Sequence, residues 1–78
     1  MTTEPTRTQM LSMEDVVRRC LFTPQHVRRL VREGRFPVPV KLGDGKYARI
    51  GFVDYEIEQW LQDRIAKRKE ALRDLEAV

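Results

Sequence analysis

One short segment, residues 23–37, most strongly limits what this chain can fold into. Thr23 is a good N-cap, and Pro24 suits the first helical position because its missing N–H would have no partner there. Gly34 is a typical left-handed residue after a helix, so we predict a short helix that begins at Pro24 and ends at Gly34. Its apolar residues share one face: Val27, Leu30 and Val31. The opposite face carries Gln25, Arg29 and Arg32, with Arg28 beside them. This layout favours a helix that enters a DNA groove over a merely solvated basic helix.

Positive charge is concentrated around this helix. The chain holds 15 Lys and Arg against 12 Asp and Glu, a formal net charge of +3. Residues 18–49 hold nine basic and two acidic residues, a local charge of +7, whereas residues 1–17 and 50–78 each come to −2. Such a block is typical of a polyanion-binding protein, because each basic group that neutralises a phosphate releases condensed counterions. The alternation of basic and bulky apolar residues expected of a membrane-surface helix is absent, so we expect no membrane partner.

The 78 residues predict one domain, near the lower size limit for an apolar core without staples. The single Cys20 excludes an internal disulfide, and with the single His26 it cannot complete a four-ligand zinc site. We expect Cys20 to be a small core residue and His26 to be half-buried. The sequence shows no signal peptide, long apolar run, catalytic constellation or phosphate-binding glycine loop. We therefore expect a soluble, cytoplasmic protein that is not an enzyme and needs no cofactor or metal.

Residues 1–10 are polar and predict a disordered leader. Ser12 with Asp15 predicts a capping box for a helix from Met13 to about Cys20, whose buried face would carry Val16, Val17 and Cys20. Together with the helix that begins at Pro24, it makes a candidate helix-turn-helix.

The period changes after Pro37. Alternating residues up to Ile50, interrupted by Gly43-Asp44-Gly45, predict a β-hairpin whose tight turn has positive φ angles and whose tip is basic. Pro39 suggests that its first strand is an edge strand, and we expect Tyr47 to support the hairpin. Asp54 is expected to cap a long third helix with an apolar stripe of Ile57, Trp60, Leu61 and Ile65. The sequence therefore predicts a mainly α fold with a small β-hairpin, a winged helix-turn-helix over residues 11–68, followed by a charged helical extension over residues 69–78.

The order of these elements, with two local signatures, resembles the AlpA-type prophage regulators and the related small excisionases, which share a MerR-like winged helix-turn-helix. The signatures are VRRLVREGRFP at residues 27–37 and EIEQWL at residues 56–61. The resemblance covers about residues 11–68. It implies that the second helix reads the major groove, that Thr23 and Arg29 contact DNA, and that the wing touches phosphates or the minor groove. The chain departs from relatives at Pro24, often basic or polar there, at Arg28, often aromatic, and at Gly51, where many place a wing arginine.

Eight residues form the predicted DNA-binding set: Thr23, Gln25, Arg28, Arg29, Arg32, Lys41, Lys46 and Arg49. Arg29 and Arg32 point away from the core face and can bind guanine bidentately, although both could instead hold phosphates. Gln25 can pair with adenine, the alternative being a solvated side chain. The wing residues suit phosphate contacts, and Arg49 could substitute for the missing arginine at Gly51.

Three functions are compatible with the sequence. The leading hypothesis is an excisionase, or recombination directionality factor, that binds and bends attachment-site DNA so that an integrase partner excises a prophage or integrative element. The second is an AlpA-like regulator of prophage transcription, and the third is a module whose basic face meets an acidic protein. Because one small domain buries little DNA surface, we also expect cooperative head-to-tail self-association on DNA.

Overall fold

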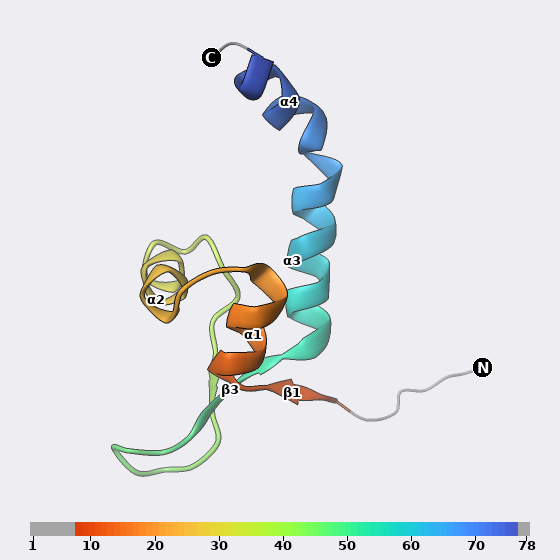
Figure 1. The fold of residues 1–78 in the computed structure, drawn as a ribbon. Helices are drawn as coiled ribbons and strands as arrows, with labels where there is room; N and C mark the ends of the chain where they lie inside the picture. The colour runs from red at the N-terminus through yellow and green to blue at the C-terminus, as the bar shows by residue number, and fades with distance from the viewer. Residues whose placement is uncertain (1–7, 77–78) are drawn as a thin grey trace, which may run out of the picture.

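The computed structural model describes residues 8–76, which form four helices and a small sheet (Figure 1). The elements in chain order are β1 (Met10–Leu11), α1 (Met13–Cys20), α2 (Pro24–Arg32), β2 (Val40–Lys41), β3 (Ile50–Val53), α3 (Asp54–Ala66) and α4 (Arg68–Glu76). The helices α1 and α2 form the helix-turn-helix, and the loop at residues 42–49 with strands β2 and β3 forms the wing. The predicted fold class is confirmed. Residues 1–7, most of the predicted leader, and residues 77–78 of the predicted extension lie outside the described residues.

The sheet has three antiparallel strands in the order β1-β3-β2, rather than the two strands that the sequence predicted. Met10 pairs with Val53 and Leu11 with Phe52, while the other edge of β3 pairs with β2. Met10 therefore belongs to the sheet and not to the leader in which the sequence analysis placed it. A two-residue strand is too short to show an alternating pattern, so β1 could not be predicted from hydrophobic periodicity.

The wing is mostly loop, because β2 has only two residues and β3 begins at Ile50. Its base is held by a hydrogen bond from the Leu42 N–H to the Arg49 carbonyl (2.7 Å), and the N–H of Ala48 donates to the Gly45 carbonyl (3.1 Å). The prediction of positive φ angles in its turn was wrong, since Gly34 is the one described glycine with a positive φ. A long loop spreads the chain reversal over several residues, so neither turn glycine needs that conformation.

The predicted N-caps of the first two helices are confirmed, whereas α2 ends at Arg32 with Glu33 as its C-cap, two residues before the predicted end at Gly34. Ser12 Oγ accepts the Asp15 N–H (3.1 Å), and the Asp15 carboxylate accepts the Ser12 N–H (3.2 Å). Thr23 Oγ1 accepts the N–H of His26 (3.1 Å) at the start of α2. After α2, Gly34 has φ 72°, the left-handed conformation expected at this position.

The start of α3 differs from the prediction, because Val53 is the N-cap and makes no side-chain cap bond. Asp54 is the first residue of the helix, and its carboxylate accepts a hydrogen bond from Arg19 Nη1 (2.7 Å) instead of capping. The second guanidinium nitrogen of Arg19 reaches Glu58 Oε1 (2.6 Å). Arg19 thus ties α1 to the first two turns of α3, and these carboxylates raise the pKa of its guanidinium.

The turn between α1 and α2 contains an unexpected left-handed residue, Leu21, with φ 60°. Its N–H ends α1 by donating to the Val17 carbonyl. The Leu21 side chain is 89% exposed, so packing does not compensate for the left-handed conformation, which costs a non-glycine residue roughly 1–2 kcal/mol.

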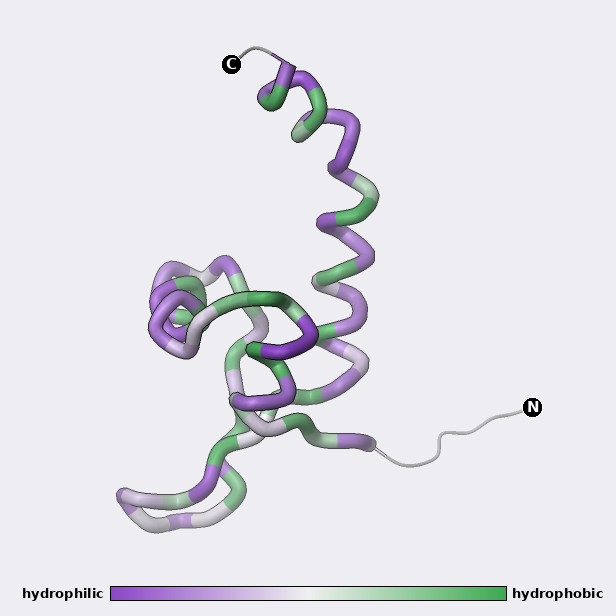
Figure 2. Tube along the Cα trace, in the orientation of Figure 1, coloured by the Kyte–Doolittle hydropathy of each residue, from purple (hydrophilic) through white to green (hydrophobic). Residues whose placement is uncertain are grey.

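The core lies where α1, α2, β3 and the first half of α3 meet, and apolar residues gather there in Figure 2. Its buried residues are Val16, Val27, Leu30, Phe36, Phe52 and Ile57. Phe36 is central: its ring centroid lies 4.8 Å from that of Trp60, 6.0 Å from Phe52 and 6.4 Å from Phe22. These edge-to-face contacts join the segment after α2 to β3 and α3.

Several predicted core residues lie only at its margin. Val17, Cys20, Val31, Trp60 and Leu61 are partly buried. Ile65 is 47% exposed, so its place in the buried stripe was wrong. The cause is that α3 is longer than the small core on which it packs, and its C-terminal part projects beyond α1, α2 and the sheet (Figure 1). The helix is also interrupted at Lys67, so α4 is a separate helix without buried residues. Partial burial raises the pKa of the Cys20 thiol, in keeping with an unreactive packing residue.

Candidate nucleic-acid interface

The helix α2 buries one face and exposes the other. Val27 and Leu30 are buried in the core. Their burial fixes the orientation of the helix so that its polar side chains face outward. The predicted DNA-binding residues of this segment are all exposed: Thr23, Gln25, Arg28, Arg29 and Arg32. Together with His26, Thr23, Gln25, Arg29 and Arg32 also border a shallow depression of about 380 Å³. All five predicted residues of this segment are therefore accessible, and four of them border one depression, whereas Arg28 lines another on the wing side.

Ion pairs divide the nine basic residues of the 18–49 block into two groups. Arg18 pairs with Asp15 (2.9 Å), Arg19 with the two α3 carboxylates described above, and Arg35 with Glu33 (3.3 Å). The other six form no ion pair within residues 8–76: Arg28, Arg29, Arg32, Lys41, Lys46 and Arg49. These six are the basic members of the predicted DNA-binding set, so within this block the basic residues without an ion pair are the ones that the sequence singled out.

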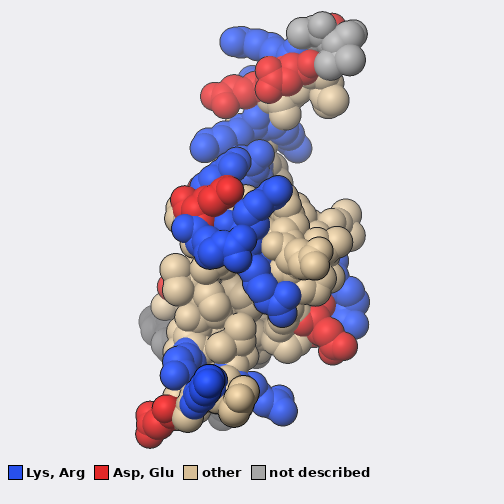
Figure 3. Space-filling model, turned by 90° about the vertical axis from the view of Figure 1, so that its left-hand side faces the viewer, with Lys and Arg blue, Asp and Glu red and all other residues tan. Residues whose placement is uncertain are grey.

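The six residues come from two parts of the chain, three from α2 and three from the wing. In Figure 3 one face of the molecule carries basic side chains over α2 and, below them, over the wing, with some acidic side chains beside them. On the wing, Lys41 ends β2, whereas Lys46 and Arg49 lie in the loop. A polyanion that runs across this face would meet both groups of charges.

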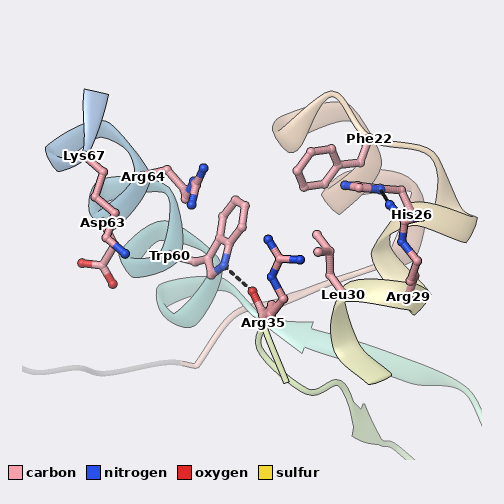
Figure 4. Close-up of a pocket in the computed structure, with 9 residues that line it drawn as sticks. All are labelled: Phe22, His26, Arg29, Leu30, Arg35, Trp60, Asp63, Arg64 and Lys67. Carbon is pink, nitrogen blue, oxygen red and sulfur yellow. Dashed lines mark hydrogen bonds between the residues drawn. The ribbon is translucent and has the colours of Figure 1, made fainter. Parts of the chain in front are cut away.

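His26 orients Arg29, a contact that the sequence analysis missed. Arg29 Nη2 lies 3.0 Å from His26 Nδ1 (Figure 4). Because a guanidinium can only donate, Nδ1 must accept, which requires the imidazole to be neutral with its proton on Nε2. The His26 ring in turn packs edge-on against Phe22, with centroids 4.6 Å apart. The spacing of three residues on a helix is the signal that could have indicated the pair.

The wing corrects one expectation and explains one departure. Tyr47 does not support the hairpin, because 91% of it is exposed, and it lies beside Lys46, whose Nζ is 5.8 Å from the ring centroid. At Gly51 a Cβ would lie 3.1 Å from Met10 Cε and 3.2 Å from Leu42 Cδ1. Both distances are tight, so a larger residue at position 51 would require the ends of the Met10 and Leu42 side chains to shift. Arg49, two residues earlier, is exposed.

A helix-turn-helix followed by a β wing is the arrangement of the winged helix-turn-helix class of proteins. Residues 9–65, from β1 nearly to the end of α3, match the family of the prophage CP4-57 regulatory protein (AlpA). This chain belongs to the AlpA family. Searches of curated proteins and of solved structures gave no match.

No helix among residues 8–76 is long and apolar enough to cross a membrane. The same residues contain no group of three or more His, Cys, Asp or Glu side chains that could hold a metal ion.

Proposed function

We propose that this protein binds double-stranded DNA with sequence preference through α2 and the wing. The observation that carries the proposal is that six basic side chains of α2 and the wing have no ion pair within residues 8–76. A folded protein this small gains little stability from unpaired like charges, and duplex DNA is the polyanion whose groove accepts an exposed short helix.

In this proposal α2 lies in the major groove. Arg29 and Arg32 donate to guanine O6 and N7 or to phosphates, Gln25 pairs with adenine, and Thr23 contacts the backbone at the start of the helix. Arg28 holds a phosphate on the wing side of α2. Lys41, Lys46 and Arg49 bind phosphates or the edge of the minor groove, because a loop tip is better suited to the backbone than to base readout.

The role that we favour is that of an excisionase: the protein binds and bends attachment-site DNA so that an integrase runs the excision reaction. A single domain of this size buries about 600–1,000 Å² on DNA, which seldom gives strong specificity. Several copies arranged head to tail would add affinity cooperatively and curve the DNA as they accumulate. Free in solution, the protein would then be largely monomeric.

The second role is regulation of a prophage promoter, and the family's description as a regulatory protein favours it. Both roles use the same DNA contacts and differ in what the bound DNA recruits. A third possibility, an acidic protein partner in place of DNA, needs the same positive face but no groove recognition.

A gel-shift titration at several salt concentrations tests the DNA-binding proposal. If six basic residues each neutralise a phosphate, log K should fall with log salt with a slope of about −5, at about −0.9 per phosphate. Duplex binding that does not weaken with salt, or no binding to duplex DNA at all, would contradict the DNA-binding proposal and favour the protein partner. An excision assay with a cognate integrase, run beside a promoter-reporter assay, separates the two roles. Duplexes with one site or several adjacent sites test cooperativity, and independent filling of the sites would rule it out.

A further inference from the structure

A second basic surface lies in a groove between α2 and α3. The groove has a volume of about 600 Å³ (Figure 4). Its charged lining residues are Arg29, Arg35, Arg64, Lys67 and one carboxylate, Asp63. With His26 neutral in its contact with Arg29, the lining carries a net charge of +3. Three of its four basic residues lie outside the predicted DNA-binding set.

The groove has a fixed floor. Trp60 donates its indole N–H to the Arg35 carbonyl (2.9 Å), which holds the segment after α2 against α3. The guanidinium carbon of Arg64 lies 5.9 Å from the centroid of the same indole ring, within the range of a cation–π contact. In Figure 4, Arg64 extends from α3 beside the Trp60 ring, and Arg35 extends from the segment after α2 into the space between Trp60 and Leu30. Asp63 accepts a hydrogen bond from Gln59 (3.1 Å), so the groove's one carboxylate is engaged along its own helix.

The charges of the groove are open to an external anion. Arg64 and Lys67 are exposed and form no ion pair within residues 8–76. The contact of Arg35 with Glu33 is a long, exposed ion pair, a kind worth little in water, and a phosphate could replace it. Guanidinium groups suit this ligand because their planar donors match phosphate oxygens bidentately.

The position of the groove relative to α2 identifies the anion. His26, Arg29 and Leu30 face the groove, whereas Val27, Arg28 and Val31 face the wing side, where they line a depression with residues of β3. The groove and the wing therefore flank opposite sides of α2. A helix in the major groove likewise has one DNA strand on each side. If the wing holds one strand, the α2–α3 groove is placed to hold the other.

We propose that this groove binds a backbone phosphate of the duplex, with Arg35 and Arg64 as its main donors, so that the C-terminal half of α3 is a third DNA contact besides α2 and the wing. The proposal rests on the proposed DNA binding by α2. Arg29 borders both surfaces, so the two contacts are continuous. The contact reads no base and fixes the position of α2 across the major groove.

The test compares Arg35→Gln and Arg64→Gln with the parent and with Arg73→Gln, a matched control on α4 that does not line the groove. Binding to cognate and scrambled duplexes is measured from 50 to 200 mM salt, and thermal melts confirm that each variant is folded. Each lost phosphate contact should reduce the salt slope by about 0.9, which makes the loss of affinity over this salt range about 3.5-fold smaller. The reduction should be equal on both duplexes, and the control should keep the parental slope.

The outcomes separate this inference from the proposed function. Parental salt slopes for both groove variants, with steep salt-dependent binding by the parent, would overturn the groove contact and leave binding by α2 intact. A loss confined to the cognate duplex would assign the groove a base contact and overturn the phosphate assignment. A parent without salt-dependent duplex binding would overturn both proposals.

Discussion

Replacing Trp60 tests the contact between α3 and the segment after α2. Two features of this residue can be removed separately: its indole N–H, which donates to the Arg35 carbonyl at 2.9 Å, and its ring, which packs on Phe36 and Phe22 at centroid distances of 4.8 and 5.9 Å. Trp60→Phe removes the donor and keeps an aromatic ring. Trp60→Ala removes both.

The expected magnitudes follow from the partial burial of the side chain. Loss of one hydrogen bond lowers the free energy of unfolding by about 0.5–1.5 kcal/mol, so we expect a cost of about 1 kcal/mol for Trp60→Phe. A fully buried aromatic costs about 3–5 kcal/mol when it is replaced by alanine. Because Trp60 lies at the margin of the core, we expect about 2–4 kcal/mol for Trp60→Ala. Phe36→Ala, at the centre of the aromatic cluster, should cost more than either.

Thermal unfolding measures these differences. A change of 1 kcal/mol shifts the Tm of a domain this size by about 4–8 °C. The Tm should therefore be highest for the parent and should fall in the order Trp60→Phe, Trp60→Ala, Phe36→Ala. Tyr55→Ala is the matched control on α3, since Tyr55 is exposed, and it should melt close to the parent. If Trp60→Ala melts like the parent, Trp60 does not hold α3 against the segment after α2, and the reasoning is wrong.

Three further predictions concern the DNA contacts and acid stability. Arg29→Ala or Arg32→Ala should weaken binding to the cognate site by about 1–3 kcal/mol if the arginine contacts a base, and equal losses on cognate and scrambled duplexes would show a phosphate contact instead. Lys46→Glu should weaken binding to all duplexes alike and lower the salt slope, so an unchanged slope would remove Lys46 from the interface. Hydrogen bonds from the backbone N–H and the hydroxyl of Ser12 lower the pKa of Asp15 below its ordinary value of 3.8, so its stabilising effect is present above that pH and is lost as the pH falls through the lowered pKa. Asp15→Asn should therefore melt below the parent at neutral pH, and the difference in Tm should shrink below about pH 4; a difference independent of pH would refute the assignment.

The features that the sequence predicted well are local ones. The capping box at Ser12 and the cap at Thr23 each depend on residues three positions apart. Gly34 could be predicted as a left-handed residue after a helix because glycine adopts that conformation readily. The exposure of the arginines on α2 follows from the helical period once Val27 and Leu30 are assigned to the core. The exposure of Arg28, Arg29 and Arg32 was therefore predictable before any tertiary contact was known.

The features that were missed depend on contacts between distant segments. Arg19 was counted with the positive block, yet its charge is paired with Asp54 and Glu58, which are 35 and 39 residues away. Asp54 was assigned as a cap because its residue type suits one, and the competing ion pair is invisible in the local sequence. The groove between α2 and α3 brings Arg35 together with Arg64, so its charges gather only after the domain has folded.

The position of Trp60 also has a practical consequence. It is the only tryptophan in the chain, and the two tyrosines, Tyr47 and Tyr55, are exposed on the wing and on α3. Fluorescence excited at the red edge of the absorption band, where tyrosine does not absorb, therefore comes from a single site whose neighbours are Arg35 and Arg64. The native protein therefore carries an intrinsic fluorophore, Trp60, in the floor of the α2–α3 groove, and no added dye is needed. Unfolding and occupation of the groove can be followed on the same sample.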